Sequence, residues 1–294
     1  MKTKRIIFGK RTQDIIKYIS ENDPELKNEL KLLESCIKLK TIKLFYSYRL
    51  KNKDIVTFTC KKNLLCGCCA LFHFYNIIEM YKEKVHSIML QDNSLNIMLI
   101  KIYITKGAIL SDVFKTAKRA RVIISQRRRN SLSASNLNRI KHKSIYRYIK
   151  GGIGSFQIEK EKQSDLWKIS LHEIAIVDSN DFKFETIERN EKKISTSTEL
   201  ESLLAQELWM VTGESYEVEI KKIEESDMES YKKVFNYNLN VNKLTIQDQV
   251  HCYKTLRNHH LCYSYGCLHG LKDSESWDET IDQFSLSLQK ELPI

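Results

Sequence analysis

The spacing of apolar residues divides the chain into helical and extended segments. Apolar side chains recur every three or four positions, which is the spacing of a helix, in residues 11–35, 70–84, 111–130, 197–212 and 227–237. The first of these segments is interrupted by Asn22-Asp23-Pro24, a sequence that breaks helices. The pattern therefore predicts a helical N-terminal part with one break, and further helices along the chain.

Alternation of apolar and polar residues marks the extended segments. It predicts a hairpin over residues 42–58, with a turn at Lys51-Asn52-Lys53-Asp54, whose ends would bring Cys36 and Cys60 together. Further strands are predicted over residues 95–105, 154–159, 166–177 and 216–223. Because strands and helices are mixed without strict alternation, we expect an α+β fold with a largely antiparallel sheet flanked by helices.

Composition and charge narrow the classes of function. The 294 residues are 42% hydrophobic and 29% charged, which is typical of a globular protein with a packed core. Lys and Arg number 48 against 37 Asp and Glu, and the net charge of +11 favours a polyanionic partner such as nucleic acid. Abundant Lys, Ile and Asn are also typical of an AT-rich genome, and in that case the charge carries no functional meaning.

The apolar stretches are too short for a membrane protein. None approaches the roughly 20 apolar residues of a membrane span, and the N-terminal sequence MKTKRIIFGKRTQD has no apolar core of a signal peptide. We therefore expect a cytoplasmic protein with no membrane partner. Disulfides are rare in that compartment, so clustered cysteines point to metal or redox chemistry.

Four cysteines have the spacing of a structural zinc site. Cys60, Cys66 and Cys69 offer three thiolates within ten residues, and the predicted hairpin brings Cys36 beside them. Tetrahedral zinc takes such sulfur ligands from two short segments, and Gly67 eases the turn between the last two. Four protein ligands leave no open position for water, so the zinc is expected to be structural.

Other interpretations of the cysteines stay open. Cys68 or His73 can replace one of the four ligands, and several of the thiols can instead be small buried apolar residues. A second group at Cys252, Cys262 and Cys267 has histidines nearby, but its spacing matches no common zinc pattern and core packing explains much of it.

The order of these features resembles that of a known family. An upstream cysteine, then FTCKKNLLCGCC and IKIYITKG, resemble the start of the rolling-circle plasmid replication initiators of Gram-positive-type plasmids, members of the HUH endonuclease superfamily. Three later stretches of this sequence resemble later segments of the family: GGIGSFQIEKEKQSDLWKISLHEIAIVDS, LWMVTGESYEVEIKKIEESDMESYKKVFNY and YKTLRNHHLCYSYGCLHGLK. The similarity spans roughly residues 30–272 and rests on the order and spacing of motifs more than on identities.

The resemblance implies a domain organisation. We expect a helical segment with a zinc-binding hairpin or knuckle over residues 1–90, an HUH-like nuclease domain over 91–272 and a C-terminal tail over 273–294. Residues 178–196 are polar and are expected to form a linker or an insertion.

The resemblance also implies a catalytic metal site on the paired strands. Family members hold a divalent ion, Mg or Mn, with two histidines one residue apart on a strand, because alternate side chains share a face. Here His172 keeps one of these positions and Ser170 takes the other. Gln157 falls on the neighbouring strand where the family offers a carboxylate. With His172 and Gln157 as ligands, water and phosphate would supply the remaining positions.

A tyrosine on the last predicted helix is the expected nucleophile. The family helix carries an acidic residue four positions before its tyrosine and a lysine close by, and Asp227, Tyr231, Lys232 and Lys233 match that spacing. The resemblance implies that Tyr231 attacks the scissile phosphorus and forms a 5′-phosphotyrosyl bond, releasing a 3′ hydroxyl. A lysine would favour the phenolate, and Asp227 would activate water. Tyr237 is the alternative nucleophile.

Basic residues in the middle of the chain are the expected DNA contacts, because Lys and Arg neutralise phosphates. The set is Arg127, Arg128, Arg129, Lys141, Lys143 and Arg147. Tyr146 and Tyr148 lie among them and can stack on unpaired bases.

These features predict a plasmid replication initiator. Such an enzyme binds an origin in single-stranded or hairpin form, nicks one strand and works with host replication proteins. The sequence does not decide whether the protein is a monomer or a homodimer. One alternative is a zinc-containing DNA-binding protein of the same fold whose nuclease centre has decayed, which Ser170 motivates. Another is a transposase or relaxase of the same superfamily.

Overall fold

The computed structural model describes residues 2–47, 60, 62–132, 144–178, 182–189 and 192–270. These residues form two compact units, each built from separate stretches of sequence. The first takes its described residues from Met1–Ile77 and Val241–Asn258, and the second takes them from Ile78–Asn240 and His259–Leu271. This division differs from the predicted boundary at residue 90, because the chain returns to the first unit after residue 240.

The first unit is helical. Helix α1 (Lys2–Asn22) and helix α2 (Lys27–Ser47) are separated by the short 3-10 helix η1 (Pro24–Leu26), at the predicted break. Helix α9 (Ile246–Leu256) is bound to this pair through charged and polar side chains. The Nε of Arg11 donates to Gln249 at 3.2 Å, and the Tyr253 hydroxyl donates to Glu29 at 3.0 Å.

Part of the predicted hairpin is wrong. Residues 42–47 continue helix α2, whereas we expected them to form the first strand. No glycine or proline interrupts the sequence from Lys27 to Ser47, so nothing in it ends the helix earlier. The rest of the hairpin, residues 48–59, lies outside the described residues.

The second unit contains an antiparallel sheet, which agrees with the predicted α+β class. Its strands are β1 (Leu95–Gly107), β2 (Ile149–Lys160), β3 (Trp167–Asp178), β6 (Glu217–Ile223) and β7 (Cys262–Gly266). Their order is β6-β1-β3-β2-β7, and every neighbouring pair is antiparallel. The pattern predicted all of these strands except β7.

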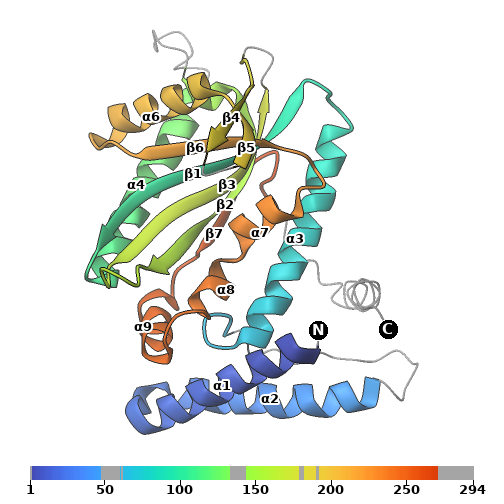
Figure 1. The fold of residues 1–294 in the computed structure, drawn as a ribbon, viewed down its shortest axis with the longest axis vertical. Coiled ribbons are helices and arrows are strands. Elements are labelled where there is room, and N and C mark those ends of the chain that lie inside the picture. The colour runs from blue at the N-terminus through green and yellow to red at the C-terminus, as the bar shows by residue number, and fades with distance from the viewer. Residues whose placement is uncertain are drawn as a thin grey trace. The chain divides into compact units, whose positions relative to one another are not determined.

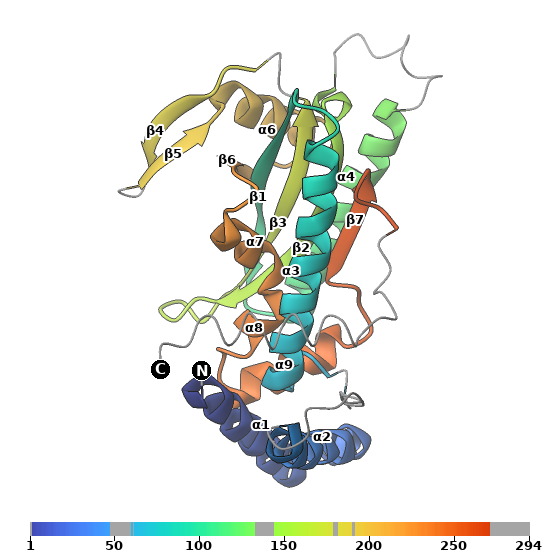
Figure 2. The ribbon, with the colours of Figure 1, turned by 90° about the vertical axis from the view of Figure 1, so that its right-hand side faces the viewer.

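The polar segment before residue 197 is a second small sheet. Strands β4 (Glu185–Arg189) and β5 (Lys192–Thr196) pair as an antiparallel hairpin, visible beside the main sheet in Figure 2. The expected linker is therefore an ordered insertion over part of its length. Its last residue is anchored, since the Thr196 hydroxyl donates to the Ile220 carbonyl at 2.5 Å.

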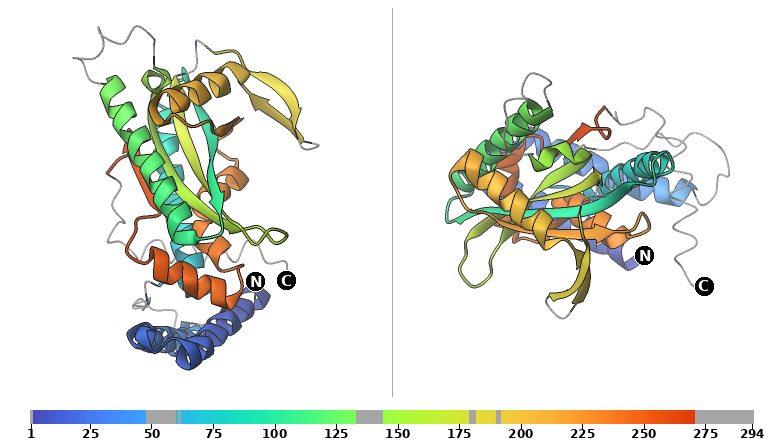
Figure 3. Two further views of the ribbon diagram at one scale, coloured as in Figure 1. Left: turned by 90° about the vertical axis from the view of Figure 1, so that its left-hand side faces the viewer. Right: turned by 90° about the horizontal axis from the view of Figure 1, so that it is seen from above.

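Helices cover both faces of the five-stranded sheet. Helix α4 (Leu110–Leu132) and helix α6 (Thr198–Thr212) lie on one face (Figure 3), and the 3-10 helix η2 (Ile145–Arg147) contacts both. Phe114 of α4 meets Phe156 of β2 there, with ring centroids 5.4 Å apart. Helix α7 (Met228–Phe235) packs on the other face (Figure 1) and is followed by helix α8 (Tyr237–Val241).

The second half of helix α3 (Gly67–Met89) also belongs to this unit, and Tyr81 stacks on Phe235 of α7 at 5.7 Å. Among the helices of the described ranges, none has both the length and the apolar character required to cross a bilayer.

Candidate functional site

The four predicted cysteines meet in the core of the first unit. Their sulfur atoms all lie within 4.8 Å of one another, and all four side chains are buried. The Sγ of Cys69 lies 3.6 Å from that of Cys36 and 3.4 Å from that of Cys60, and Cys36 lies 4.0 Å from Cys66. Ligands on a tetrahedral zinc ion, with Zn–S bonds of about 2.3 Å, would be about 3.8 Å apart. The separations fit a metal site with four cysteine ligands and exceed a disulfide bond of about 2.05 Å.

Local structure explains how these cysteines are placed. Cys36 projects from α2, Cys66 directly precedes α3, and Cys69 lies in the first turn of α3. A turn over residues 62–65 leads into Cys66, with its amide donating to the Lys62 carbonyl at 2.7 Å. His73 is not among the four ligands that lie together, and the side chain of Cys68 lies outside what the structure describes.

Two side chains from the distant α9 region hold that turn. Gln249 is fully buried, and its Nε2 donates to the Leu64 carbonyl at 2.8 Å and to Asn242 at 2.9 Å. Asn242 in turn donates to the Asn63 carbonyl at 3.4 Å. The sequence offered no signal for this clamp, because its partners are about 180 residues apart.

The close packing of the thiols affects their protonation. Hydrogen bonding to Cys36, with a further contribution from burial, raises the pKa of the Cys60 and Cys69 thiols. Without a cation the cluster would stay protonated and be held together by weak S–H contacts. A divalent ion would instead deprotonate the sulfurs and bind all four.

The tyrosine helix α7 lies against the strands that carry the expected catalytic metal ligands. The Nδ1 of His172 lies 3.1 Å from the Lys233 carbonyl, so this nitrogen carries the proton and donates it. The Nε2 then accepts from the Ser170 hydroxyl at 3.1 Å. Burial is the main effect that lowers the pKa of His172, to about 4. The ring is therefore neutral at pH 7, and both nitrogens are engaged.

The side chain of Gln157 is also fully hydrogen-bonded within the protein. Its Nε2 donates to the Val234 carbonyl at 2.8 Å and to the Ser155 hydroxyl at 2.7 Å, and its Oε1 accepts from Asn240 at 3.1 Å. Ser155 donates to the same Val234 carbonyl. Carbonyls in the last turn of a helix lack intrahelical partners, so His172, Ser155 and Gln157 satisfy the end of α7. This differs from the predicted Mg or Mn site, in which His172 and Gln157 would face an ion.

Tyr231, the predicted nucleophile, points into the core. Its side chain is 0% exposed, and its hydroxyl has no hydrogen-bond partner among the described residues. Burial, with the nearby carboxylates of Glu225 and Asp227, raises the pKa of the phenol. A phenolate is therefore disfavoured in this conformation. The alternative nucleophile, Tyr237, opens α8 and is also buried.

Asp227 caps helix α7. One carboxylate oxygen accepts from the Ser230 amide at 3.1 Å, and the other accepts from the Ser230 hydroxyl at 2.8 Å and from Lys221 at 3.0 Å. Burial raises the pKa of Asp227, but Lys221 and Ser230 outweigh it and lower the pKa overall. The acidic residue four positions before Tyr231 thus has a structural task as the N-cap.

The two lysines beside Tyr231 lie nearer the surface. Lys232 pairs with Glu229 at 2.6 Å, and Lys233 is exposed. Sequence reasoning missed a polar group on the same sheet face, where Lys101 lies opposite His172 in the strand register. The Nζ of Lys101 donates to Glu219 at 2.7 Å, and the Tyr103 hydroxyl donates to the same carboxylate at 3.3 Å.

The predicted DNA-binding arginines separate into two kinds. Arg127 pairs with buried Glu207 at 2.5 Å, and Arg128 is itself buried and lies 3.6 Å from Glu173. Arg128 is therefore held inside the protein and Arg127 is half-buried, which differs from the exposed position expected of a DNA contact. Arg129 is exposed, and Arg147 in η2 is half-buried. Lys141 and Lys143 lie outside the described residues.

Comparison with known proteins gives no relative for this chain. No protein-family model matches it, and neither the curated proteins nor the solved structures yield a match.

Proposed function

We propose that this protein is a zinc-containing DNA-binding protein built like a rolling-circle replication initiator, with its nicking centre closed. The observation that carries DNA binding is the solvent-facing side of α4. Lys115, Lys118, Arg119 and Arg129 are exposed along this helix of 23 residues, which is about 34 Å long at 1.5 Å per residue. These four side chains occupy about 21 Å of it, from Lys115 to Arg129, and would follow a nucleic-acid backbone and release its counterions.

The zinc in this proposal is structural. Cys36, Cys60, Cys66 and Cys69 would supply all four ligands of a tetrahedral ion, so bound zinc would offer no open position for substrate or water. Its role would be to fix the turn before α3 against α2. Zinc binding and folding of the first unit should therefore be coupled.

Strand nicking is the second candidate, and a specific contact favours it. The expected tyrosine helix lies directly on the strand pair that carries His172 and Gln157, joined through Lys233 and Val234. For Tyr231 to act, α7 would have to move so that the phenol left the core and His172 became available to a metal. The buried phenol and the engaged ring nitrogens are the reasons for ranking this candidate second.

The binding proposal is tested with oligonucleotides from the DNA that flanks the gene of this protein, in single-stranded, hairpin and duplex form. Affinity should fall steeply with salt, and Arg129→Gln should weaken binding and reduce the magnitude of the salt slope by about 1. Lys162→Gln removes the same charge from the exposed turn between β2 and β3 and should change affinity little. Equal losses in both variants would contradict a binding face on α4.

The nicking candidate is tested on supercoiled plasmid carrying the same flanking DNA, with Mg²⁺ or Mn²⁺. The proposal expects binding without relaxation. Relaxation that is lost in Tyr231→Phe would overturn the closed centre and make Tyr231 the nucleophile. Relaxation that survives in Tyr231→Phe but is lost in Tyr237→Phe would assign the reaction to the alternative tyrosine.

A further inference from the structure

Two glycines allow two tyrosines to cross strand β2. Tyr263 and Tyr265 lie on the edge strand β7, opposite Gly154 and Gly152 of β2. A Cβ atom at Gly152 would come within 2.6 Å of the Tyr265 hydroxyl, and one at Gly154 within 2.5 Å of the Tyr263 hydroxyl. The glycines thus leave room for both rings to lie flat across β2 and reach the next strand.

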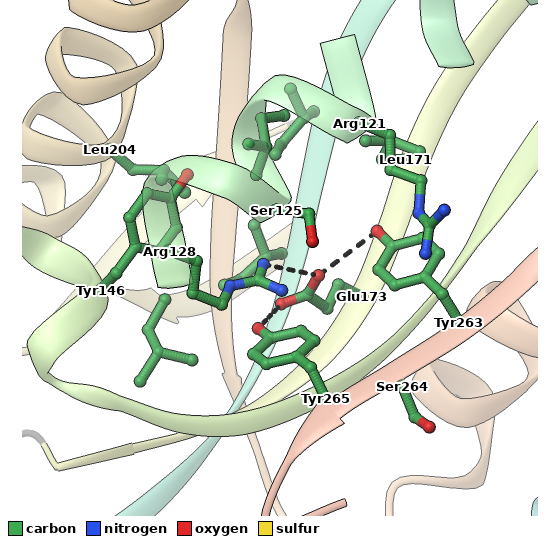
Figure 4. Close-up of a pocket in the computed structure, with 14 residues that line it drawn as sticks. Arg121, Ser125, Arg128, Tyr146, Leu171, Glu173, Leu204, Tyr263, Ser264 and Tyr265 are labelled. Atoms are coloured by element: carbon green, nitrogen blue, oxygen red, sulfur yellow. Dashed lines mark hydrogen bonds and ion pairs between the residues drawn. The ribbon is translucent and has the colours of Figure 1, made fainter. Parts of the chain in front are cut away.

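The tyrosine hydroxyls converge on a buried carboxylate (Figure 4). Both donate to Glu173 of β3, Tyr265 to Oε1 and Tyr263 to Oε2 at 3.3 Å, and Arg128 of α4 lies 3.6 Å from the same Oε2. The Arg128 guanidinium lies 3.2 Å from the centre of the Tyr265 ring. Burial opposes the charge of Arg128, but Tyr265 and Glu173 outweigh it and raise its pKa. Arg128 is therefore charged at any ordinary pH.

A second arginine adds a positive charge that no carboxylate of the described residues balances. The Arg121 guanidinium lies 4.4 Å from the centre of the Tyr263 ring, and among the described residues it forms no ion pair. Two guanidinium groups and one carboxylate leave this site with an excess of one positive charge. A charge held partly away from water without a counterion is costly.

A cavity of about 40 Å³ lies among these side chains. It has room for roughly three water molecules, or for one small ion in their place. Arg121 and Arg128 line it, and the Nε–H of each is buried without an acceptor among the described residues. The Tyr146 hydroxyl is also buried without a partner in this part of the chain, but Figure 4 shows it pointing away from Glu173, so it lies outside this group.

We propose that this cavity binds a small, singly charged oxyanion. The two free donors both belong to guanidinium groups, the local charge exceeds neutrality by one, and the space suits a group of four or five heavy atoms. Planar guanidinium groups match the geometry of oxyanions. This inference does not depend on DNA binding, because the cavity is too small for a nucleotide.

The test measures the thermal midpoint of the full chain as sodium nitrate or sodium phosphate is added at constant ionic strength. Sodium morpholinoethanesulfonate, whose anion is too large for the cavity, makes up the remaining salt. Nitrate or phosphate should raise the midpoint in a saturable manner. Arg121→Gln should raise the apparent Kd at least tenfold, whereas Arg119→Gln, on the exposed side of the same helix, should leave it within twofold.

Glu173→Gln gives a result of opposite sign. It raises the excess positive charge from one to two and should tighten anion binding several-fold. Arg121 is only half-buried, so Arg121→Gln is expected to fold even where the Glu173 variant does not. The proposal is overturned by equal stabilisation from the large anion, by an unchanged Kd in Arg121→Gln, or by no saturable effect of either oxyanion on the native protein.

Discussion

The cysteine cluster and the tyrosine helix both carry reactive side chains, and the two regions use them in opposite ways. In the cluster, the sulfurs of Cys36, Cys60, Cys66 and Cys69 contact one another at ligand distances. Around the tyrosine helix, the polar atoms of His172, Gln157 and Asp227 are engaged in hydrogen bonds that end or begin α7. Four sulfurs gathered around one point indicate a cation site, whereas a satisfied network indicates a structural joint.

The largest expected effect comes from removing a cysteine of the cluster. Purified protein should contain one zinc ion per chain, and Cys60→Ser should lose the metal and about 4 kcal/mol or more of the free energy of unfolding. Metal content by mass spectrometry and thermal melts measure both. Cys262→Ser, a half-buried cysteine outside the cluster, should keep the zinc. A native protein without zinc would remove the contrast between the two regions.

A smaller effect is expected from the clamp on the turn before Cys66. Gln249→Met keeps the volume of the side chain but leaves the Leu64 carbonyl and Asn242 without this donor, which should cost about 1–3 kcal/mol. Zinc should also leave faster, as measured by transfer to a coloured chelator. Unchanged release would mean that the cysteines hold the turn by themselves.

The pH dependence of stability tests the hydrogen-bonded region around helix α7. Burial lowers the pKa of His172 to about 4, below the value of about 6.5 expected in the unfolded chain. The unfolded state therefore binds more protons between these values, and stability should fall as the pH drops from about 6.5 to about 4. Denaturant unfolding across this range measures the slope. In His172→Gln the slope should be smaller, and an unaltered slope would assign it to other groups.

The smallest effect is expected at Tyr231, and its sign is unusual. Because the hydroxyl is buried without a partner among the described residues, Tyr231→Phe should leave stability unchanged or raise it by about 1 kcal/mol. Tyr253→Phe is the matched control, since that hydroxyl donates to Glu29, and it should lose about 1–2 kcal/mol. A clear loss of stability in Tyr231→Phe would show that the phenol has a partner and would reopen its part in chemistry.

Strong periodicity made most of the second unit predictable. Strands β1 and β3 of that unit are long apolar runs. In the first unit, the break at Pro24 was predictable because proline interrupts a helix. Residues 42–47 were misassigned because alternation over so few residues does not decide between a strand and the continuation of a helix. Strand β7 was missed because its Tyr-Ser-Tyr sequence is polar by composition, and its packing depends on glycines more than a hundred residues earlier.

The sequence predicted the contacts within a segment at the candidate sites, but not the contacts between distant segments. Ligand spacing is local, so Cys60, Cys66 and Cys69 could be grouped from the sequence. Alternation also placed Ser170 and His172 on one face of a strand. Alternation does not predict that the carbonyls of α7 cover that face, because the sequence does not reveal which helix packs there. The pairing of Arg128 with Glu173 likewise joins a helix to a strand that sequence spacing cannot connect.

The clamp on the turn before Cys66 has a consequence for the newly made chain. All four cysteines leave the ribosome early, but Asn242 and Gln249, which hold their turn, follow well over a hundred residues later. A nascent chain broken off after α7 would thus carry every thiol of the cluster and lack the two amides that secure them. Such a fragment should hold zinc loosely and expose its sulfurs to oxidation, so metal retention would report whether translation had continued past α9.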